Sequence, residues 1–179
     1  MPDGIPCTGF TVADLLIALA LAAVLTTTAV PAFTDMLLEA RMTRQVNGLV
    51  RGVHLAKQTA QLRLRDVAIC KSPDGRRCGH DGRWHDGWLL FVNTDRDYPP
   101  TVGTDEPALA SGGAWTGGRI FSNRRFFIFR PATIRSTNGT LTFCDRRGEA
   151  GARALVISYT GRPRISRRAP RNRPLICQA

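Results

Sequence analysis

The chain has 179 residues, of which 25 are Lys or Arg and 14 are Asp or Glu, so its formal net charge is +11 at neutral pH. Beyond its N-terminal apolar run it is long enough for one compact domain and too short for two well-packed ones. The charge favours an anionic partner, although 23 of the 25 basic residues are arginines, which a codon bias would also produce.

The N-terminus combines a short polar stub with a long apolar segment. The stub ends at Gly9, and the apolar run that follows continues to Pro31 and Phe33. Residues 15–33 carry no charge, and at about 1.5 Å per residue they cross most of a bilayer core as a helix. A secretory signal peptide would place its small-residue cleavage site after the apolar core. Cleavage at Gly9 would instead leave the helix on the mature protein.

A single acid, Asp14, stands at the start of the apolar run. A carboxylate at the centre of a membrane helix costs about 2.5–3.5 kcal/mol on insertion scales, so an acid in such a helix usually has a partner. The alternative is that Asp14 reaches the membrane interface by itself.

The residues from Gly9 to Leu16 resemble the class III signal of type IV pilins and pseudopilins, and Pro31 falls where pilins commonly carry a helix-kinking proline. The resemblance implies that a prepilin peptidase cuts between Gly9 and Phe10 and that the new Phe10 amine is methylated. It also implies that Asp14 pairs with the N-terminal ammonium of a neighbouring subunit. The family usually has Glu at that place, and its leaders usually carry Lys or Arg, whereas this leader carries only Asp3.

Apolar residues after the membrane run recur at intervals of three and four, which is typical of a helix with one buried face. We therefore expect one helix from about Phe10 to about Leu62, with its second half packed on a globular domain. The recurring positions are Leu38, Met42, Val46, Leu49, Val53, Ala56 and Ala60.

Beyond residue 63 the pattern becomes alternating and is interrupted by Gly, Pro, Asn and Asp, which favours short strands. An antiparallel sheet packed against the helix, an α+β architecture, is predicted. The expected strands are Val67–Cys70, Trp88–Asn93, Arg119–Phe121, Phe126–Phe129, Thr140–Cys144 and Ala154–Tyr159.

Four of the five cysteines remain if the leader, which contains Cys7, is removed. Cys70 and Cys78 flank a Pro-Asp-Gly turn signal, so we expect a hairpin disulfide between them. The other pair, Cys144 and Cys177, would fasten the C-terminal end. Such bonds fit an oxidising periplasm or cell exterior.

A zinc site is the alternative use of Cys78, because His80 and His85 follow it. The spacing of these three residues matches no familiar zinc motif, which favours the disulfide.

The order of several segments is similar to the FimT/GspH family of minor pilins and minor pseudopilins. This resemblance covers nearly the whole chain. It implies the type IV pilin fold, a head in the periplasm, anchoring by one helix in the bacterial inner membrane, and later assembly with other pilin subunits into the surface pilus or a type II secretion pseudopilus. FimT-like members are associated with DNA uptake in natural transformation. The segments are 67–70, 74–78, 87–91, 105–107, 141–145 and 157–164.

Three segments are expected on this basis: a prepilin leader over residues 1–9, a hydrophobic assembly helix over 10–37, and a globular domain over 38–179. No Ser-His-Asp set, paired carboxylates or phosphate loop stands out, so neither catalytic residues nor a cofactor or metal is predicted. The Asn93-x-Asp95-x-Asp97 spacing opens like a calcium loop but lacks the later Gly and Glu, which favours a polar turn.

The basic C-terminal arm, residues 161–179, carries six arginines and no acid. Guanidinium groups are planar, always charged and suited to phosphate oxygens. Prolines 163, 170 and 174 disfavour a helix, and a bond from Cys177 to Cys144 would make the arm a closed loop. We therefore expect DNA binding to phosphates without sequence preference. The six residues are Arg162, Arg164, Arg167, Arg168, Arg171 and Arg173.

Three hypotheses follow: a minor pilin that captures DNA for natural transformation, a minor pilin or pseudopilin that only primes assembly or secretion, and a basic anchored protein that contacts acidic lipid or surface polysaccharide. A solvated arm that only keeps the protein soluble remains the alternative for the six arginines.

Overall fold

A computed structural model describes residues 11–79, 81–131 and 135–177. The chain divides into two compact units, Met1–Glu39 and Ala40–Ala179. We refer to the second unit as the head. It holds the strands of the described residues and two disulfides.

The helix α1, Val12–Arg63, is 52 residues long and includes Pro31. Among the described residues it is the one helix long and apolar enough to cross a membrane, with a mean hydropathy of 2.2 over an 18-residue window. Large apolar side chains such as Leu16, Leu25 and Phe33 are exposed in this part of α1. By length and composition alone, a helix of this kind can cross a bilayer.

The part of α1 that belongs to the head buries the predicted apolar stripe. Met42, Leu49 and Val53 are at most 1% exposed and pack in one core cluster with residues of both sheets. The periodicity of three and four therefore predicts the buried face of this segment correctly.

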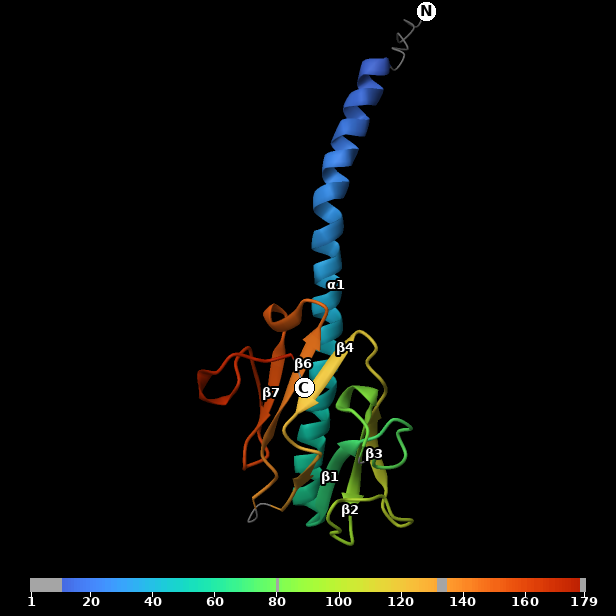
Figure 1. Cartoon of the computed structure of the whole chain (residues 1–179). Coiled ribbons are helices and arrows are strands. Elements are labelled where there is room, and N and C mark those ends of the chain that lie inside the picture. Colours follow the sequence, from blue (N-terminus) through green and yellow to red (C-terminus); the bar gives the residue numbers. More distant parts are fainter. Residues whose placement is uncertain (1–10, 80, 132–134, 178–179) are drawn as a thin grey trace, which may run out of the picture. The chain divides into compact units, whose positions relative to one another are not determined.

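Two four-stranded antiparallel sheets cover α1 in the head (Figure 1). Sheet A has the strand order β3-β2-β1-β5, and sheet B has the order β4-β6-β7-β8. The strands are β1 Asp66–Lys71, β2 Trp88–Asn93, β3 Ala108–Gly112, β4 Gly118–Ser122, β5 Phe126–Phe129, β6 Gly139–Asp145, β7 Arg153–Ile157 and β8 Pro163–Ser166.

The chain crosses between the sheets rather than completing one before the other. It leaves sheet A after β3, forms β4 in sheet B, returns for β5 and then continues in sheet B from β6. Strands β4 and β5 are only three residues apart but belong to different sheets. The predicted architecture, a long helix packed on antiparallel β-structure, is confirmed. The division into two sheets was not predicted, because alternation within a strand carries no information about which strand lies beside it.

Two strands, β3 and β8, were not expected from the sequence. β3 consists of small residues apart from Leu109, and none of its residues is fully buried, so its apolar pattern is weak. β8 begins at Pro163, which an edge strand tolerates because its missing N–H faces no partner. The expected strand to Tyr159 ends instead at Ile157, where a turn precedes β8.

All three tryptophans belong to the head core. Trp84, Trp88 and Trp115 are at most 8% exposed. The Trp84 ring lies 5.6 Å from that of Phe127, and its indole N–H donates to the carbonyl oxygen of Arg124. These rings therefore stabilise the core and are not available as platforms for bases.

Candidate nucleic-acid interface

The C-terminal arm begins with a tight turn that leads from β7 into β8. The Ser158 N–H donates to the carbonyl oxygen of Arg162 at 3.1 Å, and the Gly161 N–H donates to that of Ser158 at 2.9 Å. The Arg162 N–H also donates to the Ser158 hydroxyl oxygen. Gly161 has a φ of +69°, the left-handed conformation that favours glycine. The turn therefore fixes the backbone from which the first two arginines project.

The pairing of β8 with β7 determines which face of sheet B carries Arg164. Arg164 lies opposite Val156, whereas Ile165 lies opposite Leu155. Leu155 is buried in the core cluster that includes α1, and Val156 packs in a separate cluster with Leu175. Since paired residues share a face, Arg164 lies on the face turned away from α1.

The rest of the C-terminal arm folds back onto this outer face. A short 3₁₀ turn, Pro170–Asn172, is closed by the Ala169 N–H, which donates to the carbonyl oxygen of Arg173 at 2.9 Å. Leu175 is 4% exposed and packs with Cys144. The prolines were expected to keep the arm extended or looped, and the described arm agrees: the turn at Pro170–Asn172 is not a right-handed helix, since φ is +63° at Arg171 and +60° at Asn172.

The predicted disulfides Cys70–Cys78 and Cys144–Cys177 are both present in the structure. Because its sulfur is bonded to Cys70, Cys78 is not a thiolate ligand for zinc. His80 lies outside the described residues. In the part of the chain that the structure describes, no group of three His, Cys, Asp and Glu side chains is placed to hold a metal ion. The second disulfide makes the C-terminal arm a loop fixed at both ends.

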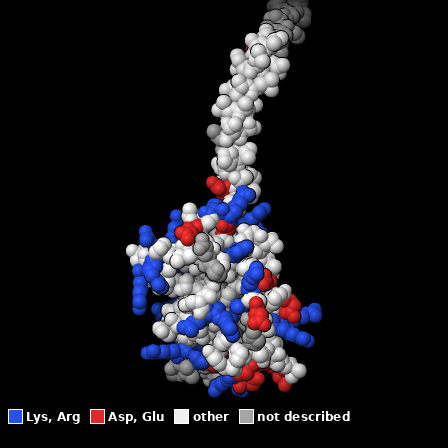
Figure 2. Space-filling view, in the orientation of Figure 1, with Lys and Arg blue, Asp and Glu red and all other residues white. Residues whose placement is uncertain are grey.

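All six predicted arginines have exposed side chains, and none forms an ion pair with an acid among the described residues. Arg168 and Arg173 donate to backbone carbonyls of the arm itself, those of Asn172 and Pro170. These bonds leave the positive charges unneutralised. In Figure 2, Lys and Arg side chains are spread over the visible face of the head, while Asp and Glu side chains form small separate groups.

A groove of 420 Å³ lies between the C-terminal arm and sheet B. Ala169, Pro170 and Arg173 form its arm side, and Asn123 and Thr142 belong to the sheet side. Among the described residues, its lining has one charged side chain, that of Arg173, and no acid. The groove therefore offers hydrogen-bonding groups and positive charge to an anion bound along the arm.

Asp145 fixes the chain next to the disulfide that holds the arm. Its carboxylate accepts hydrogen bonds from the Arg147 guanidinium, the shortest at 2.8 Å. Burial by itself raises the pKa of Asp145, but these hydrogen bonds and the positive charge of Arg147 outweigh it and hold the pKa below its ordinary value. The turn between β6 and β7 is thereby stabilised by an ion pair at neutral pH.

The two predicted assembly residues, Asp14 and Pro31, lie in α1, and their partners in an assembly belong to the proposal below. The Thr11 N–H and hydroxyl donate to Oδ2 of Asp14 at 3.0 and 2.8 Å, and the Asp14 N–H donates to the Thr11 hydroxyl oxygen. This reciprocal arrangement is a capping box, which satisfies free N–H groups at a helix start. The predicted cleavage residues Gly9 and Phe10 lie outside the described residues.

Comparison with known proteins shows the family of this chain. A family model described as "Type II transport protein GspH" matches residues 45–161. No curated protein matches the chain. Among solved structures, the Pseudomonas aeruginosa type IV minor pilin FimU is similar in two crystal forms, each with a TM-score of 0.52 and 16% identity. The alignments cover 73% and 78% of this chain and 98% of FimU.

The minor pseudopilin EpsH from the type 2 secretion system of Vibrio cholerae is also similar, with a TM-score of 0.48 and 12% identity over 70% of this chain and 96% of EpsH. At its level of identity the FimU match shows a shared fold. The family model covers well over half of the chain. The chain therefore belongs to the GspH family and has the fold of the minor type IV pilins.

Proposed function

We propose that this chain is a minor type IV pilin that binds DNA without sequence specificity through its C-terminal arm and supports DNA uptake in natural transformation. One observation carries the proposal: six exposed arginines, without a single acid among them, lie on the C-terminal arm, which is held by the pairing of β8 with β7 and by the Cys144–Cys177 disulfide. The family model ends at residue 161, so the arm lies beyond the part of the chain that it matches.

The chemistry of the arm suits a phosphate backbone. Guanidinium groups form paired hydrogen bonds with phosphate oxygens and stay charged at all physiological pH values. A loop that is fixed before binding loses less conformational entropy than a free tail of the same length. Contacts to phosphates position a protein on DNA but do not read its sequence. This is the property that uptake of foreign DNA requires.

The N-terminal segment supports the pilin part of the proposal. We propose that a prepilin peptidase removes residues 1–9, that the Phe10 amine is methylated, and that α1 anchors the chain in the inner membrane before assembly with other pilin subunits. The Asp14 carboxylate caps its own helix through Oδ2, which leaves Oδ1 for the ammonium of a neighbouring subunit. Pro31 would set the local bend of α1 in the filament.

The experiment is DNA binding by the full chain in nonionic detergent, measured by fluorescence anisotropy over a range of salt concentrations. Six contacts to duplex phosphates give a log–log slope of about −5, at about −0.9 for each contact. Replacing all six arginines of the arm by Gln should remove most of this slope. Duplexes of unrelated sequence should bind equally well.

The matched control changes the net charge by the same amount at six exposed arginines outside the arm. They are Arg65, Arg76, Arg77, Arg96, Arg135 and Arg146, none of which lies in α1 or lines a cavity described below. If this control variant and the arm variant weakened DNA binding equally, the arm would have no special role and the proposal would fail.

A second function is favoured by the description of the family model, which names a type II transport protein. A minor pseudopilin, or a minor pilin that only primes assembly, would use the same fold and the same α1. It would not need the arm for DNA. Unchanged DNA binding in the arm variant would therefore leave this assembly role as the better account.

A further inference from the structure

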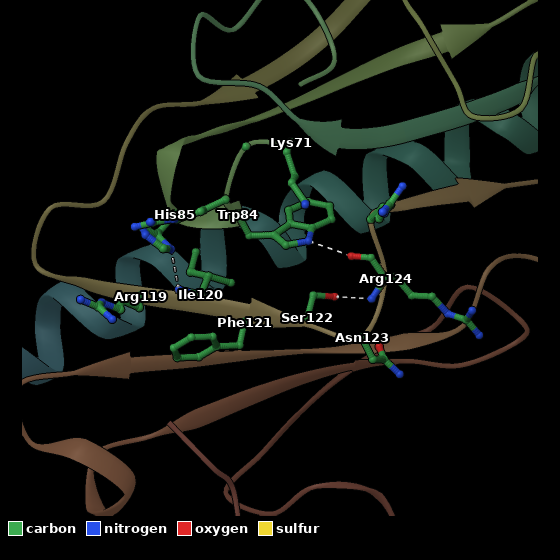
Figure 3. A pocket seen from close by; sticks show the side chains of 12 residues that line it. Lys71, Trp84, His85, Arg119, Ile120, Phe121, Ser122, Asn123 and Arg124 are labelled. Carbon is green, nitrogen blue, oxygen red and sulfur yellow. Dashed lines mark hydrogen bonds between the residues drawn. The ribbon is translucent and has the colours of Figure 1, made fainter. Parts of the chain in front are cut away.

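A second basic cavity lies outside the C-terminal arm, at the place where sheets A and B separate. It has a volume of 590 Å³ and is bounded by the end of β1, the segment 82–85 and strand β4 (Figure 3). Strand β4 is at the edge of sheet B, so the backbone on this side has no strand partner. The cavity is built entirely from residues of the head.

The charges that line this cavity are all positive. Lys71, Arg83, Arg119, Arg124 and Arg125 contribute to the lining, and no Asp or Glu does so among the described residues. The Arg124 guanidinium is held by hydrogen bonds to Asn138, and the others make no hydrogen bond or ion pair through their side chains with a described residue. Four cationic side chains are thus available to a ligand.

Two of these cations repel each other. Burial lowers the pKa of the Lys71 ammonium, and the charge of Arg125 lowers it further, while Asp81 and Asp86 act in the opposite direction from outside the lining. The Asp86 carboxylate accepts a hydrogen bond from the Arg83 backbone N–H. An anion placed between Lys71 and Arg125 would relieve their repulsion, which makes the site better suited to an anion than to water.

The neutral side chains of the cavity present hydrogen-bond donors, so they also favour a ligand whose atoms are hydrogen-bond acceptors. Nδ1 of His85 accepts the Ile120 N–H at 3.3 Å, so the proton of the neutral ring is on Nε2, a donor. The Ser122 hydroxyl oxygen accepts the Arg124 N–H, which leaves its own O–H to donate. Figure 3 shows Lys71, His85 and Ser122 around the buried Trp84 indole. Ligand oxygens without protons, as in a phosphodiester, match this set of donors.

The cavity and the groove beneath the C-terminal arm are neighbours, because both are lined by the end of β4. Phe121, Ser122 and Asn123 line both, and Arg173 lies on the far side of the groove. A polyanion that is bound to the arm at Arg173 can therefore extend past the end of β4 to the cavity. We infer that this cavity binds phosphodiester groups of the same nucleic acid that the arm holds, with Lys71, Arg119 and Arg125 as its main contacts. This inference rests on the proposed function.

The test uses full-length protein in nonionic detergent with Lys71, Arg119 and Arg125 replaced together by Gln. Loss of three phosphate contacts should flatten the salt slope by about 2.7 and weaken duplex binding at 0.1 M salt at least about tenfold. The control carries Arg44→Gln, Arg51→Gln and Arg63→Gln on α1, which changes the charge equally and should leave the slope as in the parent. A cavity variant that behaves like this control overturns the inference.

Two further measurements distinguish loss of a binding site in the cavity from loss of folding and from the effect of the arm. If the triple variant unfolds at a lower urea concentration than the parent, the single Arg125→Gln variant replaces it, with an expected change in slope of about 0.9. In the second, inorganic tripolyphosphate is added to the variant that lacks the six arm arginines. It should raise the thermal midpoint of that variant, and the triple substitution should remove the increase.

These outcomes separate the cavity from the arm. Loss of DNA binding in the arm variant together with a retained response to tripolyphosphate supports both proposals. If the arm variant binds DNA like the parent and the cavity variant does not, the arm proposal fails and the cavity site stands. If tripolyphosphate has no effect on the arm variant, the cavity inference is wrong whatever the arm does.

Discussion

Among single residues, Gly161 has the most demanding position in the C-terminal arm. Its φ of +69° favours glycine, and a Cβ built there would lie 3.2 Å from a ring carbon of Phe129 and 3.4 Å from the Ser136 hydroxyl oxygen. The same residue donates the hydrogen bond that closes the turn before β8. Backbone conformation and packing therefore both select glycine where the arm begins.

We expect Gly161→Ala to destabilise the head by about 2 kcal/mol, since a left-handed alanine costs about 1–2 kcal/mol and the close contacts add to this. Gly148→Ala measures the cost of the left-handed backbone alone, because the φ of Gly148 is +65° and no atom lies within 4 Å of the added Cβ. Gly113→Ala has neither constraint. Urea unfolding should rank the three in that order, and equal midpoints for Gly161→Ala and Gly113→Ala would contradict the described turn.

Asp145 gives the head a defined dependence of stability on pH. Its pKa in the folded state lies below the ordinary value of 3.8, so its contribution is present above about pH 4 and is lost as the pH falls through the folded-state pKa. Asp145→Asn should therefore cost about 1–2 kcal/mol at pH 7 and less than this at pH 2. Unfolding free energies at both pH values measure this.

Asp105→Asn is the matched control, because Asp105 is exposed and accepts no hydrogen bond from a described residue. Its effect should be small at both pH values. A loss of stability from Asp145→Asn that is the same at pH 2 and pH 7 would show that the ion pair with Arg147 is not its cause.

The residues of the arm and of the cavity differ in how far a sequence reveals them. The six arm arginines follow one another within nineteen residues without an acid, so the sequence alone shows their common charge. Lys71, Arg119 and Arg125 come from separate segments, and only the fold brings them to one cavity. The Arg124-Arg125 pair beside a predicted strand is the one local signal that the sequence offers.

At the scale of elements, the disulfide Cys144–Cys177 links the end of the arm to β6 across 33 residues. Closing a loop of this length stabilises a protein by about 3–4 kcal/mol in the chain-entropy model. Because Leu175 and Ala169 pack on the same face, the bond also keeps the arm in position for binding. Its removal should therefore affect both stability and affinity.

Replacing Cys144 and Cys177 together by Ser should lower DNA affinity while leaving the salt slope unchanged, because the number of arginines that contact phosphate stays the same while the arm loses order. The matched control replaces Cys70 and Cys78, which join β1 to its following turn and do not hold the arm. Anisotropy titrations should show weaker binding for the first pair only. Equal affinities for the two double variants would mean that the arm needs no fixed end.

The elements themselves were predictable where their own patterns are strong. The long helix and six strands follow from apolar spacing, with β2 and β5 correct in both bounds. β3 and β8 were missed, since small residues and a leading proline give no alternating apolar signal. The division into two sheets depends on contacts between distant segments, which local spacing does not encode.

For the whole molecule, the fold and the family leave two roles with the same architecture, DNA capture and assembly alone. They differ in one respect: both roles need α1, but only DNA capture needs the charge of the C-terminal arm. Substitutions confined to the arm therefore separate the two roles while leaving the helix and the core of the head intact.

The most direct test of DNA capture is natural transformation of the native host carrying the variant with all six arm arginines replaced by Gln. Surface pili are counted in the same cells, and the control strain carries the six substitutions outside the arm. We predict that the arm variant assembles pili at the parental level but transforms at the frequency of a deletion strain, whereas the control transforms normally. Parental transformation by the arm variant would contradict the proposed function.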